Sequence, residues 1–310
     1  MGPTSNPATV EYRFDGRVAV VTGAGRGIGR AYARLLAERG ASVVVNDLGA
    51  STGGSGADIA PATAVADEIV AAGGTAVADP HDVSTTDGAS ALVDTAIERF
   101  GRIDVLVNNA GIIRWAGMPE VDADNLARHL DVHVGGSFNT VRAAWPHLVG
   151  QGYGRIVNTT SAGLFGLSNN TSYATAKGAV IGLTRSLATA GTAHGITANC
   201  IAPGAMTRMA GPVSDETDTR MSPELVAPMV ALLAHEECPV TGEIYAAGFG
   251  RFARIFIGMA PGYVHEGSVP TIEDVAAQWE AINDEPGYVI PADLPDWSGS
   301  FMAHLRPTDT

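Results

Sequence analysis

Lysine is almost absent from this chain of 310 residues. Lys177 is its only lysine, and its 19 basic residues are otherwise all arginine. Arginine serves wherever a surface needs positive charge, but its flat guanidinium does not replace a compact ammonium that must contact several oxygens at once. A composition that uses arginine everywhere else therefore indicates that position 177 requires an ammonium group.

Cysteine, positive charge and long apolar runs are also scarce. The two cysteines, Cys200 and Cys238, lack metal-ligand spacing, so we predict no metal site and favour a reducing compartment. The net charge of −14 argues against nucleic acid or an anionic membrane as the main partner. No apolar stretch is long enough to span a bilayer, and residues 1–15 do not resemble a signal peptide. We therefore predict a cytoplasmic protein.

Apolar runs of strand length alternate with amphipathic segments of helix length, which is typical of a parallel sheet with crossover helices. The predicted strands are Arg17–Val21, Ser42–Asn46, Thr75–Ala78, Ile103–Val107, Arg155–Asn158, Ile196–Cys200 and Glu243–Ala246. The predicted helices are Ile28–Arg39, Pro61–Ala72, Gly88–Phe100, Asp122–Leu148, Tyr173–His194 and Pro223–His235. This order predicts an α/β fold of the Rossmann type, with a doubly wound, seven-stranded parallel sheet and a ligand site at the carboxyl ends of its strands.

Three stretches depart from this alternation. The Gly- and Ser-rich segment 49–56 is predicted to be a mobile loop, and the long polar segment 204–222 is predicted to be a lid over the site. The third stretch, 251–310, is predicted to contain one helix that begins after the N-cap Thr271. We therefore predict a catalytic domain over residues 13–250 and a C-terminal extension over 251–310 that packs on the core or on a neighbouring subunit.

A glycine-rich loop joins the first predicted strand to the first helix. Gly23, Gly27 and Gly29 permit a tight turn and let backbone amides approach a pyrophosphate at the positive end of the helix. Asp47 ends the second predicted strand, where a carboxylate accepts both ribose hydroxyls of an adenosine. It would repel a 2′-phosphate by roughly 4 kcal/mol per unit-charge pair at contact, and Arg26 would offset part of that. NAD is therefore favoured over NADP.

Tyr173 and Lys177 stand four residues apart in a predicted helix, so they share one helix face. Lowering a tyrosine pKa from about 10 to about 7 needs roughly 4 kcal/mol of selective phenolate stabilisation. One ammonium at about 4 Å supplies energy of that order at an effective dielectric constant near 20. The pair therefore predicts an acid–base tyrosine with a lysine partner, the alternative being an ordinary surface pair.

Together these motifs resemble the short-chain dehydrogenase/reductase family. The motifs that match are the glycine loop at Thr22–Gly29, Asn-Asn-Ala-Gly at Asn108–Gly111, Tyr-x-x-x-Lys at Tyr173–Lys177 and Pro-Gly at Pro203-Gly204. The resemblance implies that Lys177 holds the nicotinamide ribose and relays a proton, that Asp82 and Val83 flank adenine, and that Thr207 meets the carboxamide. In full, the expected cofactor contacts are Gly23, Arg26, Gly27, Ile28, Gly29, Asp47, Asp82, Val83, Asn109, Ala110, Gly111, Tyr173, Lys177, Pro203, Gly204 and Thr207.

Two catalytic positions depart from the family pattern. Counting from the strand places the family's serine at Ser161, whereas counting 13 residues back from Tyr173 gives Thr160; we favour Ser161 and leave Thr160 open. Many members have an asparagine that anchors a proton-relay water where this chain has His133. A histidine can orient water and titrate near neutrality, and a structural role in the core is the alternative.

Over nearly the whole chain the resemblance extends to the dehydrogenase unit of peroxisomal multifunctional enzyme type 2 and its bacterial single-unit relatives. The features that match are Val45–Gly49 before the Gly-rich insertion, Asp131–His133 and the segment beginning Gly248–Arg251. This branch oxidises (3R)-hydroxyacyl-CoA to 3-ketoacyl-CoA with NAD, which is the activity that the resemblance implies. It also implies a homodimer or homotetramer built through the helices 122–148 and 173–194.

Two alternatives to that activity stay open. The candidate arginines for the phosphates of coenzyme A are scattered along the chain: Arg114, Arg208, Arg251 and Arg254. A free hydrophobic secondary alcohol, such as a steroid or a terpene, is therefore the alternative substrate. The alternative outside enzymology is an NAD-binding module without turnover.

Overall fold

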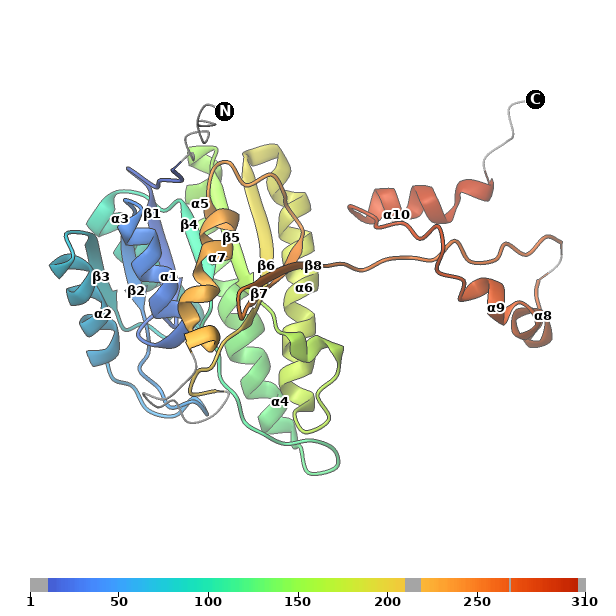
Figure 1. The fold of residues 1–310 in the computed structure, drawn as a ribbon, viewed down its shortest axis with the longest axis horizontal. Coiled ribbons are helices and arrows are strands. Elements are labelled where there is room, and N and C mark those ends of the chain that lie inside the picture. Colours follow the sequence, from blue (N-terminus) through green and yellow to red (C-terminus); the bar gives the residue numbers. More distant parts are fainter. Residues whose placement is uncertain (1–10, 210–218, 268, 306–310) are drawn as a thin grey trace, which may run out of the picture. The chain divides into compact units, whose positions relative to one another are not determined.

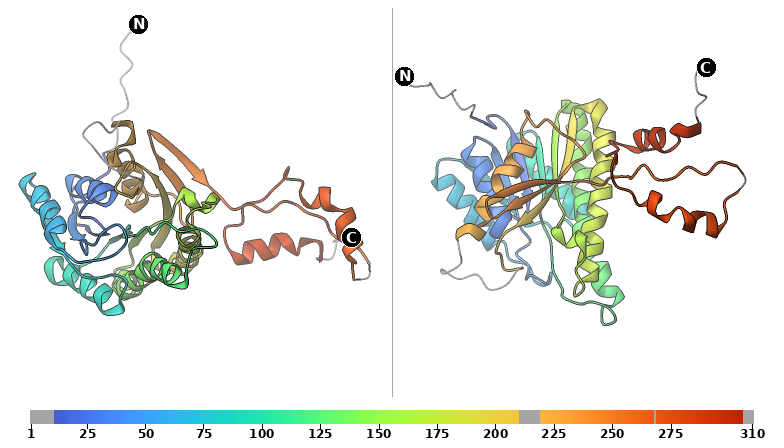
Figure 2. Two further views of the ribbon diagram at one scale, coloured as in Figure 1. Left: turned by 90° about the horizontal axis from the view of Figure 1, so that it is seen from below. Right: turned by 45° about the vertical axis from the view of Figure 1, so that its right-hand side comes forward.

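The computed structural model describes residues 11–209, 219–267 and 269–305 (Figures 1 and 2). The chain divides into two compact units, Met1–Arg254 and Ile255–Thr310. The first unit contains the sheet and the crossover helices, and each unit is described by itself below.

An eight-stranded sheet with the order β3-β2-β1-β4-β5-β6-β7-β8 forms the centre of the first unit. The strands are β1 Val18–Thr22, β2 Ser42–Asn46, β3 Thr75–Asp79, β4 Val105–Asn108, β5 Gly154–Thr159, β6 Ile196–Gly204, β7 Ile244–Gly248 and β8 Arg251–Ile255. The pairs from β3 to β7 are parallel. Because β1 lies between β2 and β4, the order of the strands reverses there, which is where doubly wound sheets bind ligands.

The predicted doubly wound Rossmann-type sheet is confirmed, and the count of seven strands is short by one. β8 follows β7 after only two residues, Phe249 and Gly250, and so closes a hairpin. A parallel pair would need a connection of about a dozen residues or more, so β8 runs antiparallel at the sheet edge. Our predicted domain boundary at residue 250 falls inside this hairpin.

Helices cover both faces of the sheet (Figure 1). They are α1 Gly27–Glu38, α2 Ala60–Ala71, α3 Thr86–Phe100, α4 Ala123–His129, α5 Gly136–Gln151, α6 Thr171–Gly191 and α7 Ala227–Ala234. Ala19 and Val21 of β1 pack in one apolar cluster with α1, α2 and α7, whereas Val18 and Val20 pack in another with α3 and α5. Successive side chains of a strand point to opposite faces, so the apolar run of β1 fills both layers of the core.

One predicted helix, Asp122–Leu148, is two helices joined by a π turn over Leu130–Gly135. The amide of Gly136 donates to the carbonyl of Asp131, five residues back, which is the wide spacing of a π turn. The turn places His133 on the inner side of the helix, where it is only 2% exposed. Single π turns inside helices are frequent at functional sites.

The segment predicted to be a mobile loop, 49–56, is hydrogen-bonded to the residues that follow β4. The amide of Ile113 donates to the carbonyl of Thr52 over 2.8 Å, and Nε of Arg114 donates to the carbonyl of Gly53 over 2.9 Å. Both donors follow β4, which is distant from the loop in sequence. The composition of the loop gave no sign of these tertiary hydrogen bonds, and its mobility stays a prediction.

The second unit contains short helices and an antiparallel bridge between Met259 and Val289. Its helices are α8 Ile272–Ala277, α9 Trp279–Ile282 and α10 Leu294–Phe301. Thr271 caps α8 in a reciprocal capping box with Asp274, as predicted, but the helix breaks at Gln278. We did not predict α10, although its cap Asp293 accepts from the amide of Asp296. None of the described residues of this unit is buried.

Within the described ranges, no helix is both long and apolar enough to cross a membrane. No group of three or more His, Cys, Asp or Glu side chains in the same ranges is arranged to hold a metal ion.

Candidate active site

The glycine loop forms a narrow backbone cradle between β1 and α1. A Cβ at Gly29 would lie 2.3 Å from the carbonyl oxygen of Gly23, so no larger residue fits there without moving the backbone. Gly23 and Gly27 have positive φ angles of 63° and 54°, which favour glycine. The loop thus presents backbone amides at the start of α1, the arrangement that suits a pyrophosphate.

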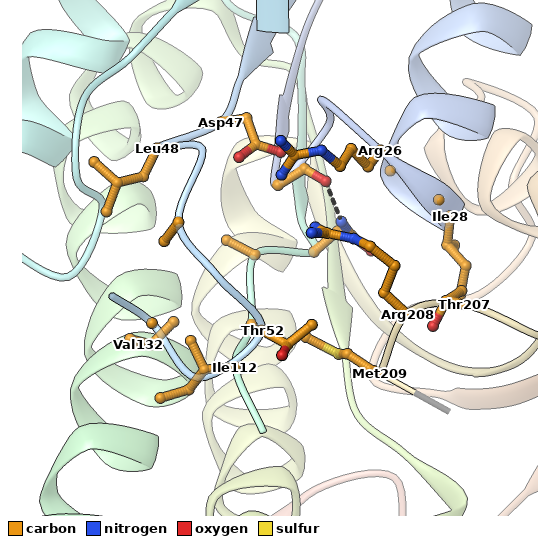
Figure 3. Close-up of a pocket in the computed structure, with 18 of the residues that line it drawn as sticks. Arg26, Ile28, Asp47, Leu48, Thr52, Ile112, Val132, Thr207, Arg208 and Met209 are labelled. Atoms are coloured by element: carbon orange, nitrogen blue, oxygen red, sulfur yellow. Dashed lines mark hydrogen bonds between the residues drawn. The ribbon is translucent and has the colours of Figure 1, made fainter. Parts of the chain in front are cut away.

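Asp47 is oriented by two backbone amides on the pocket side of β2. Its Oδ2 accepts from the amide of Gly25 over 2.8 Å, and its Oδ1 accepts from the amide of Gly49 over 2.7 Å. Arg26 lines the same pocket as this carboxylate (Figure 3). Gly25 was not among the predicted site residues, yet a Cβ there would lie only 2.8 Å from Asp47 Oδ2. The carboxylate is therefore held in a fixed orientation at the rim of the pocket.

A pocket of about 400 Å³ lies along the ends of these strands. It is lined by twelve of the predicted cofactor residues: Gly23, Arg26, Gly27, Ile28, Gly29, Asp47, Asp82, Val83, Asn109, Ala110, Gly111 and Thr207. Further lining residues were not predicted from the sequence: Leu48, Thr52, Ile112, Arg128, Val132 and Met209 among them (Figure 3). Its volume, glycine cradle and fixed carboxylate fit a nicotinamide dinucleotide.

The side chain of Asn109 holds the cradle in place. Its Nδ2 donates to the carbonyls of Thr22 and Gly23 over 2.9 and 3.1 Å. The neighbouring Asn108 donates from its own Nδ2 to Asn158 Oδ1 over 2.9 Å and so joins the ends of β4 and β5. The asparagine pair therefore organises the backbone from which the pocket is built.

Pro203 and Gly204 continue β6 as its last two residues, opposite Ala247 and Gly248 of β7. The following segment brings Thr207 over the glycine loop, where its methyl carbon would be 3.6 Å from a Cβ on Gly27. Of the predicted lid, 204–222, residues 210–218 lie outside the described residues.

Lys177 is buried on the inner side of α6, with 3% of its surface exposed. Its Nζ donates to the carbonyl of Thr159 over 2.8 Å and lies 5.7 Å from the ring centroid of Tyr173. Burial lowers the pKa of Lys177 to about 7. The tyrosine and lysine thus face one cleft, as their spacing predicted.

The pKa of Tyr173 differs from our expectation. We expected Lys177 to lower it, but burial raises the pKa of Tyr173 above its ordinary value, and only the nearby Ser161 hydroxyl acts to lower it. The ammonium of Lys177 is directed at the Thr159 carbonyl, so the phenol gains little from it in this arrangement.

The geometry separates the two candidate hydroxyls. Thr160 is 1% exposed and its Oγ1 donates to the carbonyl of Lys177 over 2.7 Å, so it serves the packing of α6. Ser161 Oγ accepts from the amide of Gly163 over 3.0 Å and interacts with the side chain of Tyr173. Ser161 is therefore the hydroxyl that shares the cleft with the tyrosine.

His133 lies against the other side of this cleft. Its Nε2 donates to the carbonyl of Ile112 over 2.9 Å, and its buried Nδ1 has no hydrogen-bond partner among the described residues. A Cβ on Gly111 would lie 2.6 Å from His133 Cε1, so the imidazole needs glycine there. Burial and the charge of Lys177 hold the pKa of His133 well below 6.5. The expected titration of His133 near neutrality therefore does not fit this environment.

A second imidazole, His129, also borders the tyrosine and was not predicted. The rings of His129 and His133 are nearly parallel, with centroids 5.9 Å apart, and both meet the Tyr173 ring almost at right angles. The signal in the sequence was their spacing of four residues, which places side chains on one helix face.

Two of the four arginines proposed for the phosphates of coenzyme A form hydrogen bonds or ion pairs with other residues of the chain. Arg114 donates to Gly53 and pairs with Asp124, and Arg254 binds Glu243 through two hydrogen bonds of 2.7 Å. Of the four, only Arg208 lines the pocket.

Comparison with known proteins places these features in a family. The family model for short chain dehydrogenase matches residues 17–218. A short-chain type dehydrogenase/reductase of Mycobacterium tuberculosis is 44% identical over 273 residues, which cover 87% of this chain and 95% of that protein. A crystal structure of a short chain dehydrogenase from Mycobacterium avium superposes with a TM-score of 0.76 at 40% identity, covering 88% of this chain and 97% of the other.

Peroxisomal multifunctional enzyme type 2 of Drosophila melanogaster is 43% identical over 277 residues, which cover 88% of this chain but only 46% of that enzyme. This chain thus spans about half the length of that relative. The model match and the near full-length relatives agree with the glycine cradle and the Tyr173–Lys177 cleft: the chain belongs to the short-chain dehydrogenase/reductase family, whose members are oxidoreductases that act on CH–OH groups with a nicotinamide cofactor.

Proposed function

We propose that this protein is an NAD-dependent dehydrogenase that converts a (3R)-hydroxyacyl-CoA to the 3-ketoacyl-CoA. The observation that carries the proposal is the presence of two sites in one sheet: a dinucleotide-sized pocket at Asp47, which follows β2, and the group of Ser161, which follows β5, with Tyr173 and Lys177 of α6. The acyl-CoA substrate is supported by the similarity to peroxisomal multifunctional enzyme type 2.

Each residue of the cleft has a distinct task in this proposal. Bound NAD supplies the acceptor for a hydride from the carbinol carbon. The phenolate of Tyr173 takes the hydroxyl proton, and the Ser161 hydroxyl donates a hydrogen bond to the substrate oxygen. Lys177 would hold the nicotinamide ribose, and its charge would favour the phenolate when its ammonium turns from the Thr159 carbonyl into the site. Nδ1 of His133 is free to orient a water that returns the proton to solvent.

NAD is proposed over NADP because of Asp47. Both of its oxygens accept from backbone amides, which orient the carboxylate at the rim of the pocket, where the adenosine ribose would bind. A 2′-phosphate there would meet a negative charge. Arg26, which lines the same pocket, reduces that repulsion without removing it.

The assay that tests the substrate compares a (3R)-hydroxyacyl-CoA with the same alcohol lacking coenzyme A, each with NAD and with NADP, by the absorbance of the reduced cofactor. We expect the thioester with NAD to have the highest kcat/KM. Higher kcat/KM for the free alcohol would establish the alternative substrate. The apolar side chains of Met206 and Met209, which line the pocket, are the observation that favours this alternative. Cofactor binding without reduction by any alcohol would establish the binding module.

Three further proposals concern the setting of this enzyme. The scarce cysteines favour a cytoplasmic location, and the family resemblance favours a homodimer or homotetramer. The division of the chain into a catalytic domain, 13–250, and an extension, 251–310, that packs on the core or on a neighbouring subunit stays a prediction. Gel filtration with light scattering would measure the oligomeric state.

A further inference from the structure

We propose that His129 is a positioning residue: together with His133 it forms a wall of two imidazole rings that fixes the ring plane of Tyr173. The inference rests on the proposed function, in which the phenol oxygen of Tyr173 exchanges a proton with the substrate. It concerns how that oxygen is held in place, and it assigns a role to a histidine that the mechanism above does not use.

The wall is defined by three ring contacts. The centroids of His129 and His133 are 5.9 Å apart with an interplanar angle of 10°. The Tyr173 ring lies 5.4 Å from His133 and 6.2 Å from His129, at angles of 87° and 82°. Edge-to-face contacts at such distances are attractive and depend on the ring planes. A tyrosine that meets two parallel rings at right angles cannot turn its plane without losing both contacts.

His129 is itself fixed on both ring nitrogens. Its Nδ1 donates to the carbonyl of Asn125 over 2.8 Å, and its Nε2 accepts from the amide of Arg114 over 3.3 Å. The partner Arg114 is in turn held by Gly53 and Asp124. The ring is fully buried at 0% exposure. These bonds set one tautomer and one orientation, so the outer ring of the wall is rigid.

The environment of His129 excludes proton exchange as its task. Burial and the charges of Arg114 and Lys177 lower the pKa of His129 below 6.5, which favours the neutral ring. Its two nitrogens are already occupied by backbone groups. What the residue offers the tyrosine is therefore a surface, and not a charge or a proton.

Tyr173 needs such a wall because its hydrogen bond with Ser161 holds the phenol oxygen but does not set the plane of the ring. Its backbone amide is fixed by the N-cap Asn170 over 3.1 Å, but the ring projects from the first turn of α6 into the cleft. Misplacing a reacting group by about 1 Å costs on the order of 100-fold in rate. A looser wall would therefore lower kcat without weakening the cofactor pocket, which His129 does not line.

Two substitutions at this position separate the ring from its hydrogen bonds. His129→Gln keeps polar groups for Asn125 and Arg114 but removes the ring, and we expect kcat to fall by about 10-fold with KM for NAD and the Kd of NADH unchanged within about twofold. His129→Phe keeps the ring and loses both hydrogen bonds, and we expect a lower Tm with kcat retained within about threefold. Neither change moves the pH profile of kcat, because the removed ring is neutral.

The matched control is His235, the buried histidine at the other end of the sheet. It also meets aromatic rings edge-on, at 5.2 Å from Phe14, and it also bonds through both nitrogens, to the Arg13 carbonyl and the Glu237 amide. We expect His235→Gln to lower Tm as His129→Gln does, with kcat per folded enzyme unchanged.

The outcomes distinguish this inference from the function on which it rests. If Tyr173→Phe abolishes turnover and His129→Gln matches His235→Gln in kcat, the wall is refuted and the proposed function stands. If His129→Phe loses as much kcat as His129→Gln, the hydrogen bonds and not the ring matter, which also refutes the wall. If Tyr173→Phe keeps full turnover, the proposed function itself fails.

Discussion

Replacing Asp47 with asparagine removes one negative charge from the rim of the cofactor pocket while keeping the size of the side chain. In the structure the two carboxylate oxygens accept from the amides of Gly25 and Gly49 over 2.8 and 2.7 Å. An asparagine has one oxygen, so its NH₂ group must face one of these two N–H donors. The substitution therefore loses one charge-assisted hydrogen bond as well as the charge.

The two effects act on the two cofactors in opposite directions. A carboxylate about 4 Å from a 2′-phosphate costs roughly 4 kcal/mol at an effective dielectric constant of 20. We take about half of that because the site is open to solvent and Arg26 lines the same pocket. Removing it improves kcat/KM for NADP by about 30-fold, at 1.4 kcal/mol per factor of ten. For NAD, the lost hydrogen bond and the weaker ribose acceptor cost about 1.5 kcal/mol, or about 10-fold.

The assay is the ratio of kcat/KM for NAD to kcat/KM for NADP, which should fall by about 300-fold in Asp47→Asn. Asp58→Asn is the control, because Asp58 carries the same charge on the same loop, bonds to the amide of Ala60 and does not line the pocket. If the two variants change the ratio equally, general electrostatics and not the ribose contact of Asp47 sets the preference, and the reasoning is wrong.

Three further predictions follow from the same site. Tyr173→Phe should lower kcat by about 1,000-fold, since acid–base catalysis contributes roughly 100- to 10,000-fold, while fluorescence titration finds an unchanged Kd for NADH. Because burial lowers the pKa of Lys177 to about 7 from 10.5, the unfolded chain binds more protons than the native protein between those values. The free energy of unfolding of the cofactor-free protein should therefore rise from pH 7 to 9 by roughly 2 kcal/mol, and urea titrations should show no such rise in Lys177→Met. Gly29→Ala puts a Cβ 2.3 Å from the Gly23 carbonyl, so calorimetry should find NADH binding lost and Tm lowered; unchanged binding would show that the cradle opens without cost.

The local features of the fold and site could be predicted from the sequence. The seven predicted strands are all present, because the apolar runs of a doubly wound sheet are buried on both faces and carry the signal themselves. The glycine loop, Asp47 at the end of its strand and the shared face of Tyr173 and Lys177 are also matters of local geometry, since each depends on residues close together in the chain.

Features that depend on long-range contacts could not be predicted in this way. The composition of the loop 49–56 gave no sign of the hydrogen bonds that it accepts from Ile113 and Arg114. The eighth strand exists only as the edge partner of β7, and its exposed side chains leave no apolar run to detect. In both cases the deciding partner lies outside the segment itself.

The catalytic residues also have some properties that follow from local sequence and others that follow from long-range contacts. The sequence by itself determined which groups meet there: one lysine, one tyrosine, two candidate hydroxyls and a histidine. Only the tertiary structure decided what each group faces. It turned Thr160 to the carbonyl of Lys177 and set His129 and His133 against Tyr173. The physical reason is that burial, ring planes and pKa directions arise from neighbours brought together by packing, and no local pattern in the chain encodes those neighbours.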